Sequence, residues 1–465
     1  MTRKHLALAW TLFLAMLLYT SLAAALEPCH LPNLPERVEC GTLEVPEDRA
    51  NPAGRRITIH FARIKATAKP AAPDPLLVLA GGPGQAATDY GPLLASAFRE
   101  ARKRRDILLV DQRGTGRSSP LRCPMPEQAI ARGDTASAQA SLRACLAALE
   151  ADPRHFHTEA ALADFEDLRR ALGYRQFSLW GGSYGTRTAL MYARRYPGSV
   201  RGMVLDSVAP PNARILLSSR HAQAALERLL ADCAADEGCA RAFPNLAREL
   251  DAVLALPSLG PHQAAAVPQL LRGAMYSAQH ASVLPFAIHA AANGRPQPLL
   301  ALYDALAGWS LEGMTFGQTL SVLCAEEAPF TDAAAMREDG AGSRFGEAYA
   351  RGWRDWCAVW PAARFDPRLS AELTRAVTSD IPTLLLAGGL DPVTPPENAH
   401  LAARTLRHSR VLVAAGAGHT FSGAGCAPRL IAAFLEHAIP AAVDGACLAA
   451  IRRPPFVLAD GQPTL

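Results

Sequence analysis

The segment that most constrains the fold of this chain is Gly-Gly-Ser-Tyr-Gly at residues 181–185, a G-x-S-x-G motif. It follows the apolar run 177–180 and opens a stretch of helical character, 186–196, which is the strand-turn-helix setting that the motif requires. A nucleophile on such a tight turn takes strained backbone angles, and the positions two before and two after it must lack side chains so that the helix packs closely. We therefore predict that Ser183 is a nucleophile, with a purely structural turn as the alternative.

Short apolar runs recur along the chain, separated by longer segments of helical character. Runs bounded by Gly and Asp at this spacing are typical of buried parallel strands joined by crossover helices, so an α/β fold is predicted. Residues 41–65 precede them and indicate an antiparallel strand pair around a turn rich in Pro, Gly and Asp. The apolar runs are residues 76–79, 107–110, 177–180, 203–205, 383–386 and 411–413.

No comparable run lies between about residues 207 and 379, where helical segments rich in Ala and Leu are broken by Pro and Gly. Strand patterns return after Ile381, so we predict that one sheet resumes there and that 207–379 is an inserted helical cap. A separate C-terminal domain is the alternative. The predicted organisation is a core in two parts, 26–206 and 380–465, with the cap between them.

A serine hydroxyl is a poor nucleophile at neutral pH, so it needs a base, and the base needs an orienting acid. Asp391 lies in a loop just past the run 383–386, and His419 lies in a Gly-rich loop just past 411–413. These places suit neighbouring parallel strands and follow the chain order Ser, acid, His. Asp206, which ends the strand after the nucleophile's, is the rival acid, and a loop hydrogen bond is its structural alternative.

An oxyanion hole is expected from two backbone N–H groups. One belongs to Tyr184, directly after the nucleophile. The other is assigned to Gly82, in the Gly-rich loop 80–85 that follows the run 76–79, because glycines let the backbone approach a tetrahedral intermediate. A phosphate cradle is the competing interpretation, but the P-loop Lys is absent and the spacing is not G-x-G-x-x-G.

The first 25 residues predict a secretory signal peptide. An apolar stretch over about residues 6–18 is preceded by two basic residues and followed by Ala at 23–25, so cleavage is expected after Ala25. A membrane anchor is the alternative, but the apolar segment is short for a span. The mature protein is therefore expected to be periplasmic or secreted, without a stable membrane anchor.

Ten cysteines in an exported chain indicate an oxidised framework. A zinc site is the rival interpretation, yet no Cys-x-x-Cys or His-x-x-x-His spacing accompanies them. Pairing between sequence neighbours is the working hypothesis, since sequence does not fix connectivity: Cys29 with Cys40, Cys123 with Cys145, Cys233 with Cys239, Cys324 with Cys357, and Cys426 with Cys447.

The charge balance disfavours a nucleic-acid partner. The formal net charge is only +4, from 47 basic and 43 acidic residues, and no basic run is longer than 102–105. No feature of the sequence indicates an oligomeric state.

Together these motifs resemble a family, the serine exopeptidases of the α/β-hydrolase fold that include proline iminopeptidases and secreted bacterial tripeptidyl aminopeptidases. Ala80 is a departure, because iminopeptidases usually carry His there, although the larger secreted members vary. The resemblance implies an α/β-hydrolase fold with an inserted helical cap, and action on peptides with a free N-terminus. It runs through Gly-Gly-Pro-Gly at 81–84, Asp-Gln-Arg-Gly-Thr-Gly-Arg-Ser at 111–118, and the segments 181–185, 388–395 and 418–419.

Family members resemble one another in presenting cap carboxylates to the substrate α-ammonium. In this chain the candidates are the adjacent acids Glu326 and Glu327, beside Cys324. Such a pair could hold a cation in a partly desolvated pocket through charge-assisted hydrogen bonds. A solvated helix end is the alternative.

The predicted reaction is acyl transfer by Ser183, His419 and Asp391, and it calls for no metal and no cofactor. An esterase or another small-molecule hydrolase would use the same three residues, but it would show no preference for a free amine. A non-catalytic binding protein on the same scaffold is the third class, which the intact set of three residues disfavours.

Overall fold

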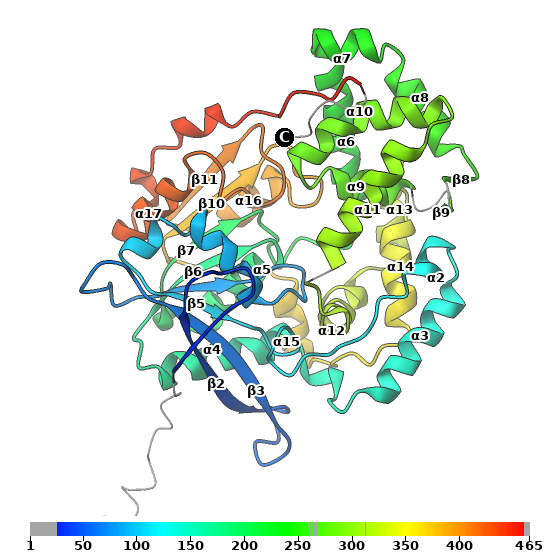
Figure 1. Cartoon of the computed structure of the whole chain (residues 1–465). Coiled ribbons are helices and arrows are strands. Elements are labelled where there is room, and N and C mark those ends of the chain that lie inside the picture. The colour runs from blue at the N-terminus through cyan, green and yellow to red at the C-terminus, as the bar shows by residue number, and fades with distance from the viewer. Residues whose placement is uncertain (1–25, 260–261, 264–266, 312, 460–465) are drawn as a thin grey trace, which may run out of the picture.

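The computed structural model describes residues 26–259, 262–263, 267–311 and 313–459 (Figure 1). The predicted signal peptide, residues 1–25, lies outside the described residues.

A nine-stranded sheet forms the centre of the molecule, in the order β1-β2-β3-β5-β4-β6-β7-β10-β11. The first three strands are antiparallel and form one edge, and β3 also pairs with β5 in antiparallel fashion. From β5 to β11 all neighbours are parallel. The strands are β1 (Glu27–Cys29), β2 (Val38–Pro46), β3 (Arg56–Ile64), β4 (Leu76–Leu79), β5 (Ile107–Val110), β6 (Phe177–Gly182), β7 (Val200–Asp206), β10 (Thr383–Gly388) and β11 (Ser409–Ala414).

The six apolar runs and the strand pair predicted from the sequence are therefore confirmed. The six runs are continuous apolar segments of the sequence because helices cover both faces of the parallel part of the sheet. One face packs on α4 (Thr158–Ala171), α5 (Tyr184–Arg195) and α16 (Pro396–Ala403). The other face packs on α17 (Ala427–His437) and on 3₁₀ segments between β4 and β5. The edge strand β1 carries no alternating pattern and was not predicted.

Helices dominate the chain between β7 and β10, and they gather beside the C-terminal ends of the parallel strands (Figure 1). This segment also contains a small ribbon of two-residue strands that was not predicted, β8 (Ser258–Leu259) and β9 (His262–Gln263). The helices are α6 (Ser219–Ala235), α7 (Glu237–Ala242), α8 (Leu246–Leu254), α9 (Val267–Ala274), α10 (Ala278–Ala292), α11 (Gln297–Leu311), α12 (Phe316–Glu326), α13 (Ala333–Gly340), α14 (Ala348–Cys357) and α15 (Pro367–Leu373).

Two hydrophobic clusters hold these helices together. One joins α6, α8, α9 and α10, and the other joins α12 and α14 to α3 (Thr135–Ala148), which precedes the nucleophile in the chain. The C-terminal segment returns to the helices as well, because Arg453 pairs with Asp232 at 2.7 Å and Val457 N–H donates to Ser282 O at 3.1 Å.

Five disulfides join the ten cysteines, in the sequence-neighbour pairs that were hypothesised. Disulfides persist in oxidising compartments, so this set indicates an extracytoplasmic protein. In the part of the chain that the structure describes, no helix has both the length and the apolar character needed to cross a membrane.

Candidate active site

Ser183 lies on a sharp turn between β6 and α5. Its backbone has φ 56° and ψ −122°, a left-handed conformation that costs free energy for a residue with a side chain. In the stretch 177–193 it is the only residue that is not buried. The turn therefore leaves Ser183 partly exposed among buried neighbours, at the C-terminal edge of the sheet.

The glycines on either side of Ser183 permit this turn. A Cβ at Gly181 would lie 2.4 Å from the carbonyl oxygen of Gly185, and a Cβ at Gly185 would lie 2.0 Å from the carbonyl oxygen of Leu79. Both distances are far inside van der Waals contact. The start of α5 can reach the ends of β4 and β6 only because both positions lack a side chain.

His419 and Asp391 lie in contact in the loops after β11 and β10. The distance from His419 Nδ1 to Asp391 Oδ2 is 2.7 Å. Thr394 supports the carboxylate with its hydroxyl at 2.8 Å and its N–H at 2.9 Å, and the N–H of Val393 adds a further bond at 2.9 Å. With Nδ1 engaged by a carboxylate, the imidazole presents Nε2 as the free basic nitrogen.

The surroundings of Asp391 favour its charged form. Burial raises its pKa, but the charge and hydrogen bond of His419 and the N–H groups of Thr394 and Val393 outweigh burial and hold the pKa well below its ordinary value. Asp391 is therefore ionised at neutral pH.

Asp206, the rival acid, does something different in the structure. Its Oδ2 accepts the N–H of Ser422 at 2.8 Å and the hydroxyl of Ser422 at 2.6 Å. Its backbone oxygen accepts the N–H of Ser183 at 2.9 Å, and the hydroxyl of Ser207 accepts the N–H of Thr420 at 2.8 Å. The end of β7 thus ties the turn of Ser183 to the loop of His419, while the direct hydrogen bond to His419 comes from Asp391.

The two N–H groups predicted for an oxyanion hole are free in the described chain, since neither Gly82 nor Tyr184 donates its N–H to another residue. Gly82 has φ 104°, which favours glycine, and it is exposed. A Cβ on the neighbouring Gly81 would lie 3.4 Å from Ser183 Cβ, so this loop runs beside Ser183. Thr319 of α12 holds the loop by donating its hydroxyl to Pro83 O at 2.7 Å.

Glu326, at the end of α12, is buried near Tyr184, the residue that follows Ser183. Its two oxygens accept the N–H of Thr158 at 2.7 Å and the hydroxyl of Thr158 at 2.8 Å. The same hydroxyl lies 2.5 Å from the phenol oxygen of Tyr184. Burial raises the pKa of Glu326 to about 7, against the lowering effect of the hydrogen bonds from Thr158.

Glu327 has a different environment from its neighbour. It forms an ion pair with Arg187, it lies 3.6 Å from Arg214, and it accepts the N–H of Ile215 at 3.1 Å. Glu327 and Arg187 are both buried. The sequence analysis treated both acids as ligands of a substrate ammonium, but the structure supplies Glu327 with a cation from the chain itself.

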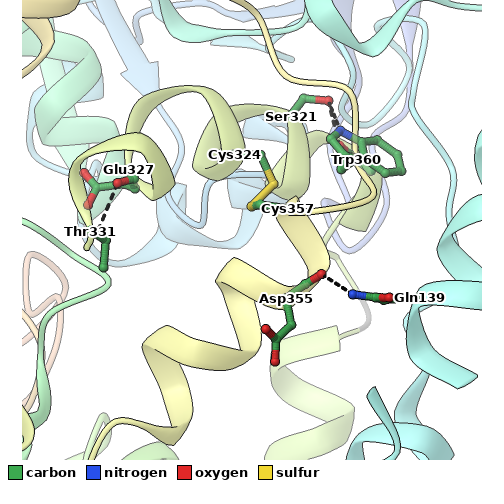
Figure 2. Close-up of a disulfide and its surroundings, with 9 residues drawn as sticks. Gln139, Ser321, Cys324, Glu327, Thr331, Asp355, Cys357 and Trp360 are labelled. Atoms are coloured by element: carbon green, nitrogen blue, oxygen red, sulfur yellow. Dashed lines mark hydrogen bonds between the residues drawn. A yellow bond between two sulfur atoms is a disulfide. The ribbon is translucent and has the colours of Figure 1, made fainter. Parts of the chain in front are cut away.

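A disulfide fixes the helix that carries both acids. Figure 2 shows Cys324 of α12 joined to Cys357 of α14, with Trp360 Nε1 donating to Ser321 Oγ at 3.1 Å nearby. Glu327 O accepts the hydroxyl of Thr331 at 2.9 Å in the same view. The positions of Glu326 and Glu327 are thus set by packing against α14 as well as by their own hydrogen bonds.

Two residues near the site were missed by the sequence analysis. Tyr276 O accepts the N–H of His419 at 2.8 Å, and the two rings lie 4.8 Å apart in an edge-on arrangement. Thr158 links Glu326 to Tyr184 as described above. Thr158 begins α4 and Tyr276 lies in the turn between α9 and α10, and neither segment carries a motif, so only the tertiary structure could identify them.

Comparison with known proteins gives two family matches. Residues 74–249 match the family described as the alpha/beta hydrolase fold, and residues 342–447 match the family described as TAP-like protein. The first match contains Ser183, and the second contains Asp391 and His419.

The relatives found by sequence include peptidases. The tripeptidyl aminopeptidase of Streptomyces coelicolor is 28% identical over 198 residues, which cover 39% of this chain and 37% of that protein. The serine protease Hip1 of Mycobacterium tuberculosis is 25% identical over 470 residues, with 88% of both chains covered. The probable proline iminopeptidase of Streptomyces coelicolor is 35% identical over 147 residues, which cover 31% of this chain and 36% of that protein. The matches to the tripeptidyl aminopeptidase and the iminopeptidase thus span only about a third of each relative.

Among solved structures, the proline iminopeptidase of Mycobacterium smegmatis matches 86% of this chain and 99% of that one, at 18% identity and a TM-score of 0.43.

Proposed function

We propose that this chain, which belongs to the α/β-hydrolase fold and is a serine hydrolase, acts as an exopeptidase that releases N-terminal residues or short peptides. The observation that carries the proposal is the meeting of three features at one sheet edge. These are Ser183 on its strained turn, the pair of His419 and Asp391, and the free N–H groups of Gly82 and Tyr184. The peptidases among its relatives support the choice of substrate class.

In the proposed reaction His419 Nε2 takes the proton of Ser183 as its oxygen attacks the scissile carbonyl carbon. Asp391 stabilises the imidazolium that forms. The N–H groups of Gly82 and Tyr184 hold the negative oxygen of the tetrahedral intermediate. His419 then gives its proton to the leaving amine, the carbon–nitrogen bond breaks, and water releases the acyl group from Ser183 by the same steps.

Exopeptidase action requires recognition of the substrate α-ammonium, and Glu326 is the group that we assign to it. It is buried on the Tyr184 side of the site, and its charge is not compensated by a guanidinium bond as that of Glu327 is. An arriving ammonium would favour the ionised form of a carboxyl whose pKa burial has raised to about 7.

The test is a panel of amide substrates assayed with the mature protein and with Ser183→Ala. The panel contains prolyl, alanyl and Pro-ending tripeptidyl amides, each with a free and an acetylated N-terminus, and a nitrophenyl ester. We expect faster cleavage of the free-amine substrates, and no cleavage by the variant. Ester turnover without amide cleavage would contradict the exopeptidase and identify a carboxylic-ester hydrolase instead.

We also propose that the protein is exported to the periplasm or beyond the cell. The five disulfides support this location, and the basic and apolar pattern of residues 1–25 supports a cleaved signal peptide. N-terminal sequencing of protein from the cell envelope or medium would test it, with Leu26 expected as the first residue.

A further inference from the structure

Four arginine side chains are buried in the described chain, and one of them differs from the others. Arg272 is only 7% exposed, yet it forms no ion pair with any described carboxylate. Its Nη2 donates to the neutral hydroxyl of Ser218 at 3.1 Å, and its Nε has no partner. The other three face carboxylates: Arg105 with Asp74, Arg113 with Asp164, and Arg187 with Glu327.

An unpaired buried guanidinium is unusual for a physical reason. The group stays protonated in proteins, so it cannot escape the cost of burial by losing its proton. Removal of a charge from water is costly unless an opposite charge or a full set of hydrogen bonds compensates for it. Arg272 is therefore a buried cation without an ion-paired carboxylate among the described residues.

The surroundings of Arg272 are aromatic. Its Cζ lies 4.1 Å from the centre of the Tyr349 ring and 5.7 Å from that of Tyr276. Ring faces attract a cation but do not neutralise its charge. Burial raises the pKa of Tyr276 to about 12, so its phenol is uncharged at neutral pH. Neither ring supplies the missing negative charge.

Arg272 also lies beside the proposed base. The Cζ of Arg272 lies 5.7 Å from the centre of the Tyr276 ring, and that ring lies 4.8 Å from the ring of His419, so one tyrosine ring is close to both the guanidinium and the imidazole. Burial lowers the pKa of Arg272, but Tyr276, Tyr349 and the charge of Asp391 outweigh burial and raise it above its ordinary value. Asp391 thus acts on Arg272 through space only, while it forms direct hydrogen bonds with His419 and Thr394.

The two charged groups lie near different residues of the site. Arg272 is close to Tyr276, which contacts His419. His419 must give its proton to the leaving amine, so the leaving fragment passes next to the imidazole. Arg272 is therefore on the side of the leaving fragment. Glu326 is linked through Thr158 to Tyr184 instead, where the proposed reaction holds the N-terminal part of the substrate.

We propose that Arg272 binds a carboxylate of the leaving fragment. The inference rests on the proposed exopeptidase function and specifies its substrates as short peptides with a negative charge just after the cut bond. That charge comes either from the C-terminal carboxylate of the peptide or from an acidic side chain. The ligand chemistry is the same in both cases, because a guanidinium matches the geometry of a carboxylate.

The experiment compares matched substrates within one enzyme preparation. The first comparison is between the free acid and the C-terminal amide of the same peptide, made for Pro-Ala and for Ala-Ala-Pro-Ala. The second comparison is between substrates with the same N-terminal residues whose leaving group is Asp-amide, which carries a side-chain carboxylate, or the neutral Asn-amide. We expect wild-type kcat/KM to favour the charged member of at least one pair by roughly 10- to 100-fold, the range of a charge-assisted hydrogen bond. The pair that shows the preference identifies the source of the carboxylate.

Three variants complete the test. Arg272→Leu should bring the ratio of charged to neutral substrate close to 1, and Arg272→Lys should retain part of the preference. Arg344→Leu is the matched control, because Arg344 lies in the turn between α13 and α14 and pairs with Asp251 at the surface, so the wild-type ratio is expected. The ratio of kcat/KM values for two substrates in one preparation does not depend on the amount of folded enzyme, so it can be measured even for a variant that folds poorly.

Equal rates of the wild type on charged and neutral members of both pairs would overturn the proposal, and so would an unchanged ratio in Arg272→Leu. Failure of the proposed function looks different. In that case none of the peptides is cleaved while the nitrophenyl ester is, and the role of Arg272 fails together with the exopeptidase.

Discussion

Replacement of Glu327 by Gln should destabilise the protein without changing its preference for a free amine. The substitution keeps the volume and the acceptor for Ile215 N–H, but it removes the charge that faces Arg187. Loss of one partner from a buried ion pair costs roughly 3–5 kcal/mol. Arg187 keeps carbonyl acceptors at Ala213, at 2.7 Å, and at Pro210, at 3.4 Å, so we expect the lower end, about 3 kcal/mol.

The assay is urea unfolding of the oxidised protein, followed by tryptophan fluorescence, together with kcat/KM on free and acetylated substrates. Glu347→Gln is the control, because Glu347 pairs with Arg351, whose side chain is 61% exposed, and such pairs contribute at most about 1 kcal/mol. The reasoning is refuted if Glu327→Gln unfolds at the wild-type urea concentration and loses its discrimination between free and acetylated substrates. That result would indicate that Glu327 binds the substrate ammonium.

Three further predictions follow from the geometry. Asp391→Asn should lower kcat by about 10⁴-fold in the amide assay, whereas Asp206→Asn should retain most of the activity; the reverse order would make Asp206 the triad acid. Gly185→Ala should give no soluble, active protein on expression, because its Cβ would lie 2.0 Å from Leu79 O, and a normal yield of active enzyme would show that the turn can relax. The pKa of Glu326 is raised from its ordinary value of 4.5 to about 7, so its protonated form favours the folded state fully below pH 4.5, and this contribution is lost as the pH rises from 4.5 to about 7. Unfolding midpoints measured from pH 4 to 8 should therefore fall less steeply in Glu326→Gln than in the wild type, and parallel curves would contradict the burial of an ionisable group there.

Local patterns predicted the sheet and the reactive turn. The strands β4, β5, β6 and β10 are buried on both faces, so their residues appear in the sequence as continuous apolar runs. The glycines around Ser183 are required by backbone contacts with Leu79 and within the turn, and such a requirement is visible in the sequence. The disulfide pairs were likewise predicted from the neighbouring positions of the cysteines in the sequence.

The environments of Glu326 and Glu327 could not be predicted in this way. The two acids are adjacent, yet Thr158 contacts one and Arg187 contacts the other, and both partners lie far away in the sequence. Which acid meets which partner depends on how α12 packs against α4 and α5. Arg272 was missed for the same reason, because its lack of a carboxylate partner is a property of the folded chain.

The most direct test of the central claim, that Ser183 is the nucleophile, is labelling with a fluorophosphonate followed by tryptic digestion and mass spectrometry. The claim predicts one adduct in the peptide 176–187, with fragmentation that places it on Ser183 and not on Ser178. It also predicts no adduct in Ser183→Ala and slow labelling in Asp391→Asn. Labelling of another residue, or no labelling of a folded wild-type protein, would contradict it.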